Sequence, residues 1–445
     1  MSESERLAGF AASLQLGDAP PEVVDKIRTN LLHNLGMLRA GSRAGTSGPG
    51  LAAAAPYDGP DAATVLHDRS RTHRDRAVVA NAAMLHASAR DDTHLPGITH
   101  LAVTSLPALL AVGEAHGSAG AEFMTALLAA YEVGSAVGVD VGPLASGRGF
   151  RPSSVLGAIA AGVGVGRLLG LDAAGLTSTI GLAAAFGGGT GQTWISGTDE
   201  WQYQVGVAGR NGLLAAELAA AGARGSHDAL DGASGLYVAL TGTRTPHAEP
   251  TELGRHWRIL EVTYKPYPIC AINQMPVTVL VAMAGHFGFT ADEIGAMRLW
   301  LSPLEAAYPG TDTHGPFSGA SGSLMSAPFC LAAAARRGTV TWADLEAVDD
   351  PDTLTLTQRI EVVPDPALRA GQCRIVVSTA RGDHDSATLP APAPFDWSFD
   401  EVHRRLVDLG SERGLTDSGL DQLVATILDL ENRPVTDLVD AVSRH

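Results

Sequence analysis

The spacing of apolar residues changes once along this chain, near residue 256, and that change limits the folds available to it. Up to about residue 240 the apolar residues recur every three or four positions, as in helices that each bury one stripe. After residue 256 short segments of alternating or β-branched residues appear between further helical segments. The sequence therefore predicts a mainly α protein, in which a large all-helical domain is followed by a smaller α+β lid domain.

The domain boundaries follow from this change in pattern and from one proline-rich connector. We expect the all-helical domain over residues 1–255 and the α+β domain over residues 256–392. The segment LPAPAPFDW (389–397) is typical of a connector. The polar helices after it, within residues 393–445 and ending at His445, are expected to return to the helical domain and pack on it. A chain of 445 residues is long enough for these separate cores.

Individual elements can be predicted from the same periodicities. Helices are expected at 20–41, 76–90, 105–117, 120–138, 152–169, 173–186, 204–222 and 226–231, and after the change at 275–287, 321–336 and 341–347. Strands are expected at 257–265, 297–302, 357–364 and 373–380. Many helices carry Ala or Gly on the buried stripe, which lets helices approach closely. The most apolar stretch, Val155–Leu171, is too short and too rich in glycine for a membrane span, so we interpret it as a buried helix.

Charge, cysteines and missing signatures exclude several classes of function. The formal charge of −17, with no cluster of Lys or Arg, argues against nucleic acid as a partner. Three well-separated cysteines and an acidic N-terminus without a signal-peptide pattern favour a reduced cytoplasm. No GxGxxG, GxxxxGK, HExxH or GxSxG motif is present, so the chemistry is expected to use acid and base side chains.

The densest group of polar residues lies in NAAMLHASARDDTHLPGITH (81–100), where a helix is predicted to end around Arg90. Its members that carry chemistry are Asp91, Asp92, Thr93, His94 and His100. Acids, a hydroxyl and imidazoles this close together can supply a general acid and a general base. Two other interpretations stay open. Either aspartate can cap the next helix, and the two histidines with the aspartates can bind a metal ion, although their spacing matches no standard metal site.

This segment resembles the MmgE/PrpD family, which includes 2-methylcitrate dehydratase and cis-aconitate decarboxylase. The family carries a pattern like His-Ala-Leu-Asp-x-Asp-Asp-Thr-His, with His-Pro shortly after it. The matching residues here are His86, Asp91, Asp92, Thr93, His94 and His100. Ala89 stands where the family usually has an aspartate implicated in catalysis, and Leu101 replaces the proline.

Other segments of the chain resemble the same family in order and spacing. AAYEVGSAVG (129–138), GRGFRPSSVLGAIAAGVGVGRLLGLD (147–172), the helix after GTDEWQYQ (197–204) and YKPYPICAINQ (264–274) each match a family motif. Departures occur at positions where the family carries proton-transfer groups. Arg151 replaces a site histidine, Trp201 a lysine, and Gln204 and Gln274 two histidines. The departures at Ala89, Trp201, Gln204 and Gln274 remove charge and proton-transfer capacity, which suggests a substrate that is less anionic than a tricarboxylate.

The candidate site residues follow from the cluster and from the resemblance. As catalytic residues we predict Lys265, His100, Asp91 and Thr93. As substrate-binding residues we predict Asp92, His94, Arg151, Ser154, Glu200, Trp201, Gln204, Tyr267, Asn273 and Gln274. Lys265 can bind a carboxylate or relay a proton, and Arg151 can clamp a carboxylate with two hydrogen bonds. The simpler alternatives are a lysine packed along an interface, a histidine satisfying a backbone carbonyl at His100, and a helix-start arginine.

The resemblance implies a divergent lyase or isomerase that abstracts a proton α to a carboxylate or carbonyl. It also implies a small-molecule carboxylate or carbonyl substrate, no metal or organic cofactor, no membrane partner and a homodimer. Dehydration, decarboxylation and epimerisation all fit such a step. Two further hypotheses are kept. One is a repurposed cyclase or addition catalyst in a specialised-metabolite pathway, and the other is a non-catalytic binding protein on the same scaffold.

Overall fold

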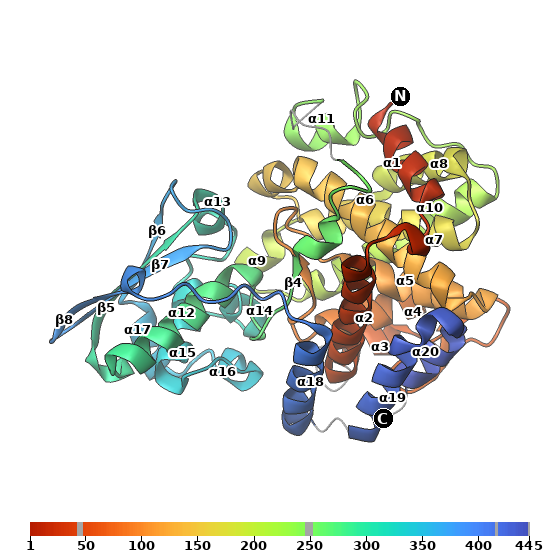
Figure 1. The fold of residues 1–445 in the computed structure, drawn as a ribbon. Coiled ribbons are helices and arrows are strands. Elements are labelled where there is room, and N and C mark those ends of the chain that lie inside the picture. The colour runs from red at the N-terminus through yellow and green to blue at the C-terminus, as the bar shows by residue number, and fades with distance from the viewer. Residues whose placement is uncertain (42–47, 245–251, 414–416, 444–445) are drawn as a thin grey trace. The chain divides into compact units, whose positions relative to one another are not determined.

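The computed structural model describes residues 1–41, 48–244, 252–413 and 417–443. The chain divides into two compact units (Figure 1). Unit 1 consists of residues 1–189, 202–264 and 396–445, and unit 2 of residues 190–201 and 265–395. The prediction of a mainly helical protein with a smaller α+β part is confirmed, because the only sheet of more than two strands in the described residues lies in unit 2.

Unit 1 is built from helices around one apolar core. The helices before the C-terminal group are α1 (Glu3–Ser13), α2 (Pro21–Gly41), α3 (Gly48–Ala53), α4 (Arg74–His86), α5 (Leu101–His116), α6 (Gly120–Gly147), α7 (Pro152–Leu168), α8 (Ala173–Phe186), α10 (Glu200–Ala220, which begins in unit 2) and α11 (Leu236–Thr241). Two short antiparallel pairs join them: β1 (Ala62–Thr64) with β2 (Arg71–His73), and β3 (Thr93–His94) with β4 (Val262–Thr263).

Helix α7 packs against α5, α6 and α8, and its small residues make this packing possible. A Cβ at Gly157 of α7 would lie 2.5 Å from Thr104 Cγ2 of α5. A Cβ at Gly212 of α10 would lie 2.4 Å from the backbone oxygen of Ala158. Neither site has room for a side chain, so the expected close approach of small-residue stripes is confirmed. Among the described residues α6 alone is long and apolar enough to cross a membrane, and 89% of its apolar window is buried.

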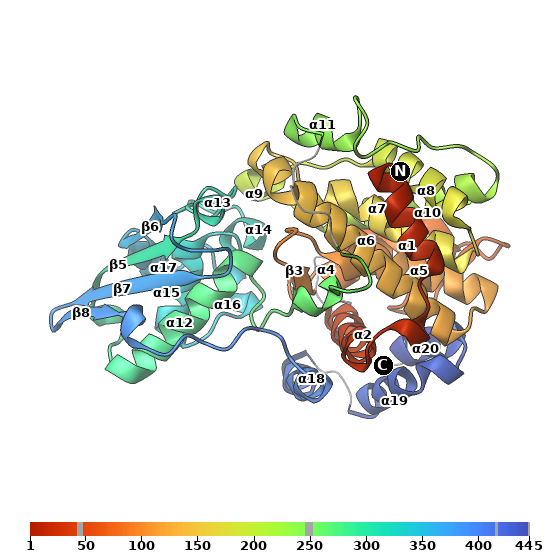
Figure 2. The same ribbon diagram turned by 45° about the horizontal axis from the view of Figure 1, so that its top comes forward.

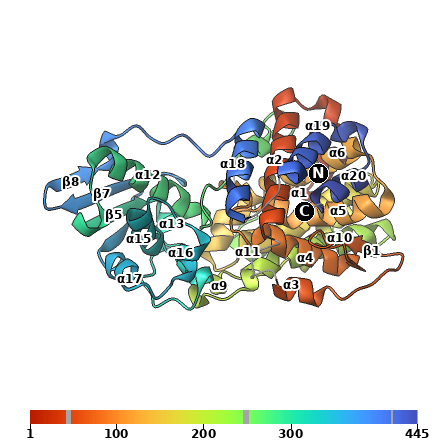
Figure 3. The same cartoon turned by 90° about the horizontal axis from the view of Figure 1, so that it is seen from below.

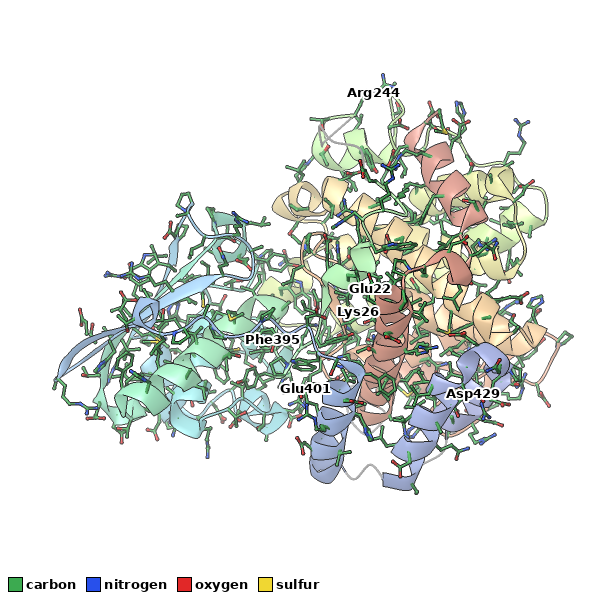
Figure 4. All side chains as sticks on the ribbon, in the orientation of Figure 1. Glu22, Lys26, Arg244, Phe395, Glu401 and Asp429 are labelled. Carbon is green, nitrogen blue, oxygen red and sulfur yellow. The ribbon has the colours of Figure 1, made fainter. Side chains whose placement is uncertain are left out.

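The C-terminal segment returns to unit 1, where α18 (Phe399–Arg413) and α19 (Asp417–Leu428) pack on α2 and α20 (Val435–Val442) packs on α5 (Figure 3). Lys26 of α2, marked in Figure 4, donates to Asp396 Oδ1 at 2.5 Å just before α18. The next residue, Trp397, stacks on Tyr264 with 5.6 Å between ring centroids. The sequence predicted two helices here and the described residues form three; the predicted end at His445 lies outside the described residues.

Unit 2 contains a four-stranded sheet in the order β6-β5-β7-β8, in which only β5 and β6 are parallel (Figure 2). The strands are β5 (Ile294–Leu301), β6 (Ile360–Pro364), β7 (Cys373–Thr379) and β8 (Gly382–Asp385). The helices are α9 (Gln192–Ser196), α12 (Ala271–Phe287), α13 (Pro303–Ala306), α14 (Ala320–Ser323), α15 (Ala327–Arg337), α16 (Trp342–Glu346) and α17 (Pro351–Thr357). Alternate residues of β5 and β7 are buried, and α12 and α15 pack together and contact β7 and β6.

Three element predictions are wrong, and each has a local cause. Residues 257–265 form a 3₁₀ turn (Arg258–Glu261) and the two-residue β4, because the Glu132 carboxylate accepts from the backbone N–H groups of Arg258 and Ile259 at 3.2 and 2.9 Å. Residues 226–231 form turns, and the helix comes later as α11. The predicted helix 321–336 is interrupted, since Ser326 accepts from the N–H of Phe329 and caps a new helix.

Candidate active site

The chain between α4 and α5 folds back on itself and gathers the polar residues of segment 81–100. Helix α4 ends at His86 rather than at Arg90, and Ala89 takes the left-handed conformation with φ of +51°. A hairpin then closes where the N–H of His94 donates to the Thr99 carbonyl at 2.9 Å. His100 follows as the N-cap of α5. Two helix ends and one turn therefore bring residues that are up to 14 positions apart into contact.

Asp91 lies between two imidazole rings. Its Oδ1 is 2.8 Å from His86 Nδ1, and its Oδ2 is 2.9 Å from His100 Nδ1. The two rings themselves are 5.3 Å apart between centroids. Asp91 is fully buried, and the side chain of His86 is only 3% exposed, whereas that of His100 is 19% exposed. His100 is therefore the member of this trio that a small molecule can reach most easily.

The tautomer of His86 is fixed by its two neighbours. Arg151 Nη2 lies 2.7 Å from His86 Nε2. A guanidinium group only donates hydrogen bonds, so Nε2 must accept, and the ring proton sits on Nδ1, where it is donated to Asp91. Burial lowers the pKa of His86 to about 3, against the opposing pull of Asp91. His86 is thus a neutral imidazole that links a buried arginine to a buried aspartate.

The tautomer of His100 is fixed in a different way. Its Nδ1 lies 2.9 Å from the Asp92 carbonyl oxygen and 3.3 Å from Thr93 Oγ1, in addition to the Asp91 carboxylate. A carbonyl oxygen only accepts, so Nδ1 carries the proton and, in the neutral ring, Nε2 carries the lone pair. Such a ring can take up a proton at Nε2, and the imidazolium that results is stabilised by Asp91. The sequence allowed His100 to be either a catalytic residue or a histidine that satisfies a backbone carbonyl. The hydrogen bond from Nδ1 to the Asp92 carbonyl serves both roles, because it leaves the lone pair on Nε2 to accept a proton.

Asp92 stabilises the start of α5, whereas Asp91 contacts the His86 ring. The Tyr131 hydroxyl of α6 donates to its Oδ2, and the N–H of Ala102 donates to its Oδ1 at 3.4 Å. The second bond is the helix-capping role that the sequence left open for this residue. Burial raises the pKa of Asp92 to about 6, although the Tyr131 hydrogen bond acts in the opposite direction.

The raised pKa of Asp92 predicts how pH changes the difference in stability between the Asp92→Asn variant and the wild type. Because the folded-state pKa lies above the unfolded value of about 3.9, the folded protein binds more protons between about pH 4 and 6. The contribution of Asp92 to the free energy of unfolding therefore falls as the pH rises through that window, and asparagine lacks this dependence. Urea titrations at several pH values should measure the free energy of unfolding of both proteins. Between pH 4 and pH 7 the value for Asp92→Asn should rise relative to that of the wild type by up to about 3 kcal/mol. A pH-independent difference would contradict the assignment.

Arg151, Ser154 and Gln204 join the same cluster. Arg151 Nη1 donates to Gln204 Oε1 at 3.3 Å, and the Ser154 hydroxyl donates to the same oxygen at 3.1 Å. Arg151 is 3% exposed and is the N-cap of α7, and its own N–H donates to the Gly189 carbonyl at 3.1 Å. Three residues that the sequence selected on two separate segments are therefore brought together on α7 and α10, and Arg151 among them contacts His86.

His94 belongs to a separate group. Its Nε2 lies 2.8 Å from Glu261 Oε2, and the other oxygen of that carboxylate lies 2.7 Å from His256 Nε2. Successive residues of a strand point to opposite sides, so Thr93 can face His100 while His94 faces away from it. His94 therefore lies apart from the Asp91–His100 pair, and its role in substrate binding stays a prediction.

The predicted residues of unit 2 lie mostly in its 265–274 segment. Lys265 is buried, and Tyr267 is half-buried. Gln274 accepts from the N–H of Tyr267 at 3.1 Å and donates to the carbonyls of Tyr267 and Ile269 at 2.9 Å each. Asn273 donates to the carbonyls of Leu324 and Met325 at 3.2 and 3.0 Å. These amides hold backbone in place, and their role as substrate-binding residues stays a prediction.

Trp201 and Glu200 also lie in unit 2, at the start of α10. Trp201 is buried, its indole N–H donates to Ser321 Oγ at 3.0 Å, and its ring lies 5.4 Å from that of Trp194. Glu200 is exposed. Across the described residues, no three His, Cys, Asp or Glu side chains are arranged to hold one metal ion.

Two members of the cluster in unit 1 were not predicted as site residues. His86 was noted only as part of a matching motif, yet it contacts both Asp91 and Arg151. Tyr131 lies in a buried part of α6, and its hydroxyl donates to Asp92. A buried hydroxyl on such a helix needs a partner, and this signal was available in the sequence.

Comparison with known proteins gives matches in both parts of the chain. The description MmgE/PrpD N-terminal domain matches residues 5–249, and MmgE/PrpD C-terminal domain matches residues 267–393. A cis-aconitate decarboxylase of Aspergillus terreus is 24% identical over 297 residues, which is 64% of this chain and 60% of that protein. A cis-aconitate decarboxylase of a second A. terreus source, strain NIH 2624, is 25% identical over 281 residues, 60% of this chain and 57% of that protein. The similarity thus spans about three fifths of the length of these relatives.

Proposed function

The chain belongs to the MmgE/PrpD family, and from that premise we propose that it is a lyase or isomerase acting on a small carboxylate or carbonyl compound. The observation that carries the proposal is the Asp91–His100 pair, with Nδ1 of His100 held in the protonated form. This pair supplies the base that abstraction of a proton from carbon requires.

In the proposed reaction, Nε2 of His100 takes a proton from the carbon next to the carboxylate or carbonyl. The electron pair of the broken C–H bond moves toward the carbonyl oxygen and gives an enolate-like state. Asp91 stabilises the imidazolium that forms, as the buried aspartate of a catalytic triad does. The imidazolium then returns the proton, either to a departing group or to carbon, which gives elimination in the first case and isomerisation in the second.

The substrate class is proposed from what differs between this chain and its family. The relatives are named cis-aconitate decarboxylase, and cis-aconitate is therefore the first compound to test. Ala89, Trp201 and Gln204 stand at positions where the resemblance leads us to expect an aspartate, a lysine and a histidine. Fewer charged groups favour a less anionic compound with one carboxylate or carbonyl and a larger apolar part.

Hydrogen exchange with solvent tests the proposed half-reaction without knowledge of the product. The purified protein is incubated in D₂O with cis-aconitate, with simple dicarboxylic acids and with bulkier monocarboxylic acids, and deuterium on carbon is followed by NMR. Exchange that depends on wild-type protein supports the proposal. A compound that raises the thermal stability of the protein but shows neither exchange nor turnover would favour the binding-protein hypothesis instead.

Lys265 is proposed to bind the carboxylate of the substrate, on the strength of the family motif around it. Lys265→Met is expected to raise KM for the exchanging acid by about 10- to 100-fold, since a hydrogen bond to a charged group contributes about 1.5–3 kcal/mol. Lys26, which pairs with Asp396, provides the comparison: Lys26→Met should lower thermal stability and leave KM unchanged. An unchanged KM in Lys265→Met would remove Lys265 from the site.

The remaining parts of the proposal concern cofactors, oligomeric state and cellular location. The proton transfers described need only side chains of this chain, and we propose no metal ion or organic cofactor. We also propose a homodimer, as the family resemblance implies, and a cytoplasmic location, as the well-separated cysteines favour. Size-exclusion chromatography with light scattering on the full chain tests the dimer directly.

A further inference from the structure

A buried arginine, a neutral imidazole and a buried carboxylate form a continuous line that ends at His100. Arg151 Nη2 lies 2.7 Å from His86 Nε2, His86 Nδ1 lies 2.8 Å from Asp91 Oδ1, and Asp91 Oδ2 lies 2.9 Å from His100 Nδ1. A buried guanidinium and a buried carboxylate thus lie on opposite sides of one imidazole ring. Only His100, at the end of the line, has a side chain that is substantially exposed.

The position of Arg151 is fixed by its backbone. The residue is the N-cap of α7 and is followed by Pro152 in the first turn. Its N–H donates to the Gly189 carbonyl, and its own carbonyl accepts from the N–H groups of Ser154 and Val155 at 3.0 and 3.1 Å. The guanidinium group also donates to Gln204. An arginine anchored at both ends presents its N–H to His86 with little freedom to move away.

The role of Arg151 follows from what His86 would do without it. A neutral imidazole can carry its proton on either nitrogen, and beside an aspartate it tends to take up a second proton. A permanently charged donor at Nε2 prevents both changes, since it requires a lone pair there. Asp91 then accepts the Nδ1–H of His86, and its second carboxylate oxygen, 2.9 Å from His100 Nδ1, keeps its negative charge beside His100.

We infer that Arg151 is a positioning residue for the proposed proton transfer, which holds His86 as the neutral Nδ1–H tautomer so that the charge of Asp91 acts on His100. The effect on catalysis rests on the proposed function, but the tautomer does not. The charged and titratable groups around this line are Asp91, Asp92 and His100 on the segment before α5, Arg151 at the start of α7, Tyr131 on α6 and Lys26 on α2.

Imidazole ¹⁵N NMR of the full-length protein, labelled at histidine, tests the inference without a substrate. The signals of His86 are assigned by their loss in His86→Gln. In the wild type, His86 should show a protonated Nδ1 and an unprotonated Nε2, with no titration between about pH 5 and 8. In Arg151→Gln, Nε2 should gain a proton and the pKa of His86 should rise, although burial still lowers it. A charged His86 in the wild type at neutral pH, or a His86 unaffected in folded Arg151→Gln, would overturn the inference.

Two further variants control for misfolding of Arg151→Gln and for a non-specific effect of removing a positive charge. Arg151→Lys keeps a charged donor and should preserve the wild-type tautomer, so it remains informative if Arg151→Gln does not fold. Arg148→Gln, three residues earlier, removes an exposed arginine that donates to the Leu240 carbonyl, and should leave the His86 signals unchanged. If the His86 signals changed equally in Arg148→Gln and Arg151→Gln, the cause would be the loss of any nearby positive charge. The specific role of Arg151 would then be rejected.

Where a substrate has been found, the pH profile gives a second readout. In Arg151→Gln a protonated His86 would neutralise Asp91 and stand about 5 Å from His100, so the acidic limb of kcat/KM should move to lower pH by about one unit. Loss of a positive charge alone would move that limb to higher pH, and such a result would contradict the inference. Absence of exchange with every compound tested would affect the proposed function and leave the NMR result intact.

Discussion

Replacement of His100 by glutamine is expected to lower the rate of proton abstraction by about 10²- to 10⁴-fold, because a positioned general base contributes about that factor. Glutamine can still donate its amide hydrogens toward the Asp92 carbonyl and the Asp91 carboxylate, so the fold should be retained. The measurement is the rate of deuterium incorporation from D₂O into the acid that wild-type protein exchanges.

A control variant lies at the other end of the same helix. His116 is the last residue of α5 and is exposed, so His116→Gln should exchange at the wild-type rate. His116→Gln should also melt within about 2 °C of the wild type, because a surface change costs within about 0.5 kcal/mol. Equal exchange rates for His100→Gln and the wild type would exclude His100 as the base.

The Asp91→Asn substitution is expected to lower both the stability of the protein and the rate of proton abstraction. The substitution leaves the buried charge of Arg151 without its counter-charge, and removal of one partner of a buried pair costs about 3–5 kcal/mol. It also removes the negative charge that lies 2.9 Å from His100 Nδ1 and stabilises the imidazolium, while the Nδ1–H of His100 keeps its hydrogen bond to the Asp92 carbonyl. The corresponding substitution in serine proteases lowers kcat by about 10⁴-fold, and a loss of similar order is expected here.

The neighbouring carboxylate provides the comparison. At pH 7 Asp91→Asn should lower the denaturation midpoint strongly, whereas Asp92→Asn should be less destabilising at pH 7 than at pH 4. The two aspartates are adjacent and equally buried, but Asp91 lies between two imidazole rings whereas Asp92 accepts from the Tyr131 hydroxyl. If both substitutions had the same pH dependence of the free energy of unfolding, the assignment of a charged Asp91 and a raised Asp92 pKa would be wrong.

Most helices could be predicted because their signal is local. The period of three to four residues in α2, α7 and α8 gives their bounds to within a few residues. The strands β5 and β7 were equally clear, since each alternates between buried and exposed positions. Segment 257–265 has a similar alternation, yet it follows the surface of α6 and gives its N–H groups to Glu132. Alternation shows that one side is buried, and it does not show what supplies the hydrogen bonds.

The candidate site could be predicted only in part, for a related reason. The sequence by itself determined that acids and imidazoles are concentrated between His86 and His100 and that the motifs are those of the MmgE/PrpD family. It also determined the small-residue stripes that let α7 pack closely.

Only the tertiary structure decided which of these residues act together. Arg151 meets His86 across 65 positions of sequence, Tyr131 meets Asp92 across 39, and His94 turns away to Glu261 across 167. The residue types and their local spacing are carried by the chain itself. Which nitrogen of an imidazole holds the proton depends on the atoms within about 3 Å of it, and those atoms arrive only when distant helices pack.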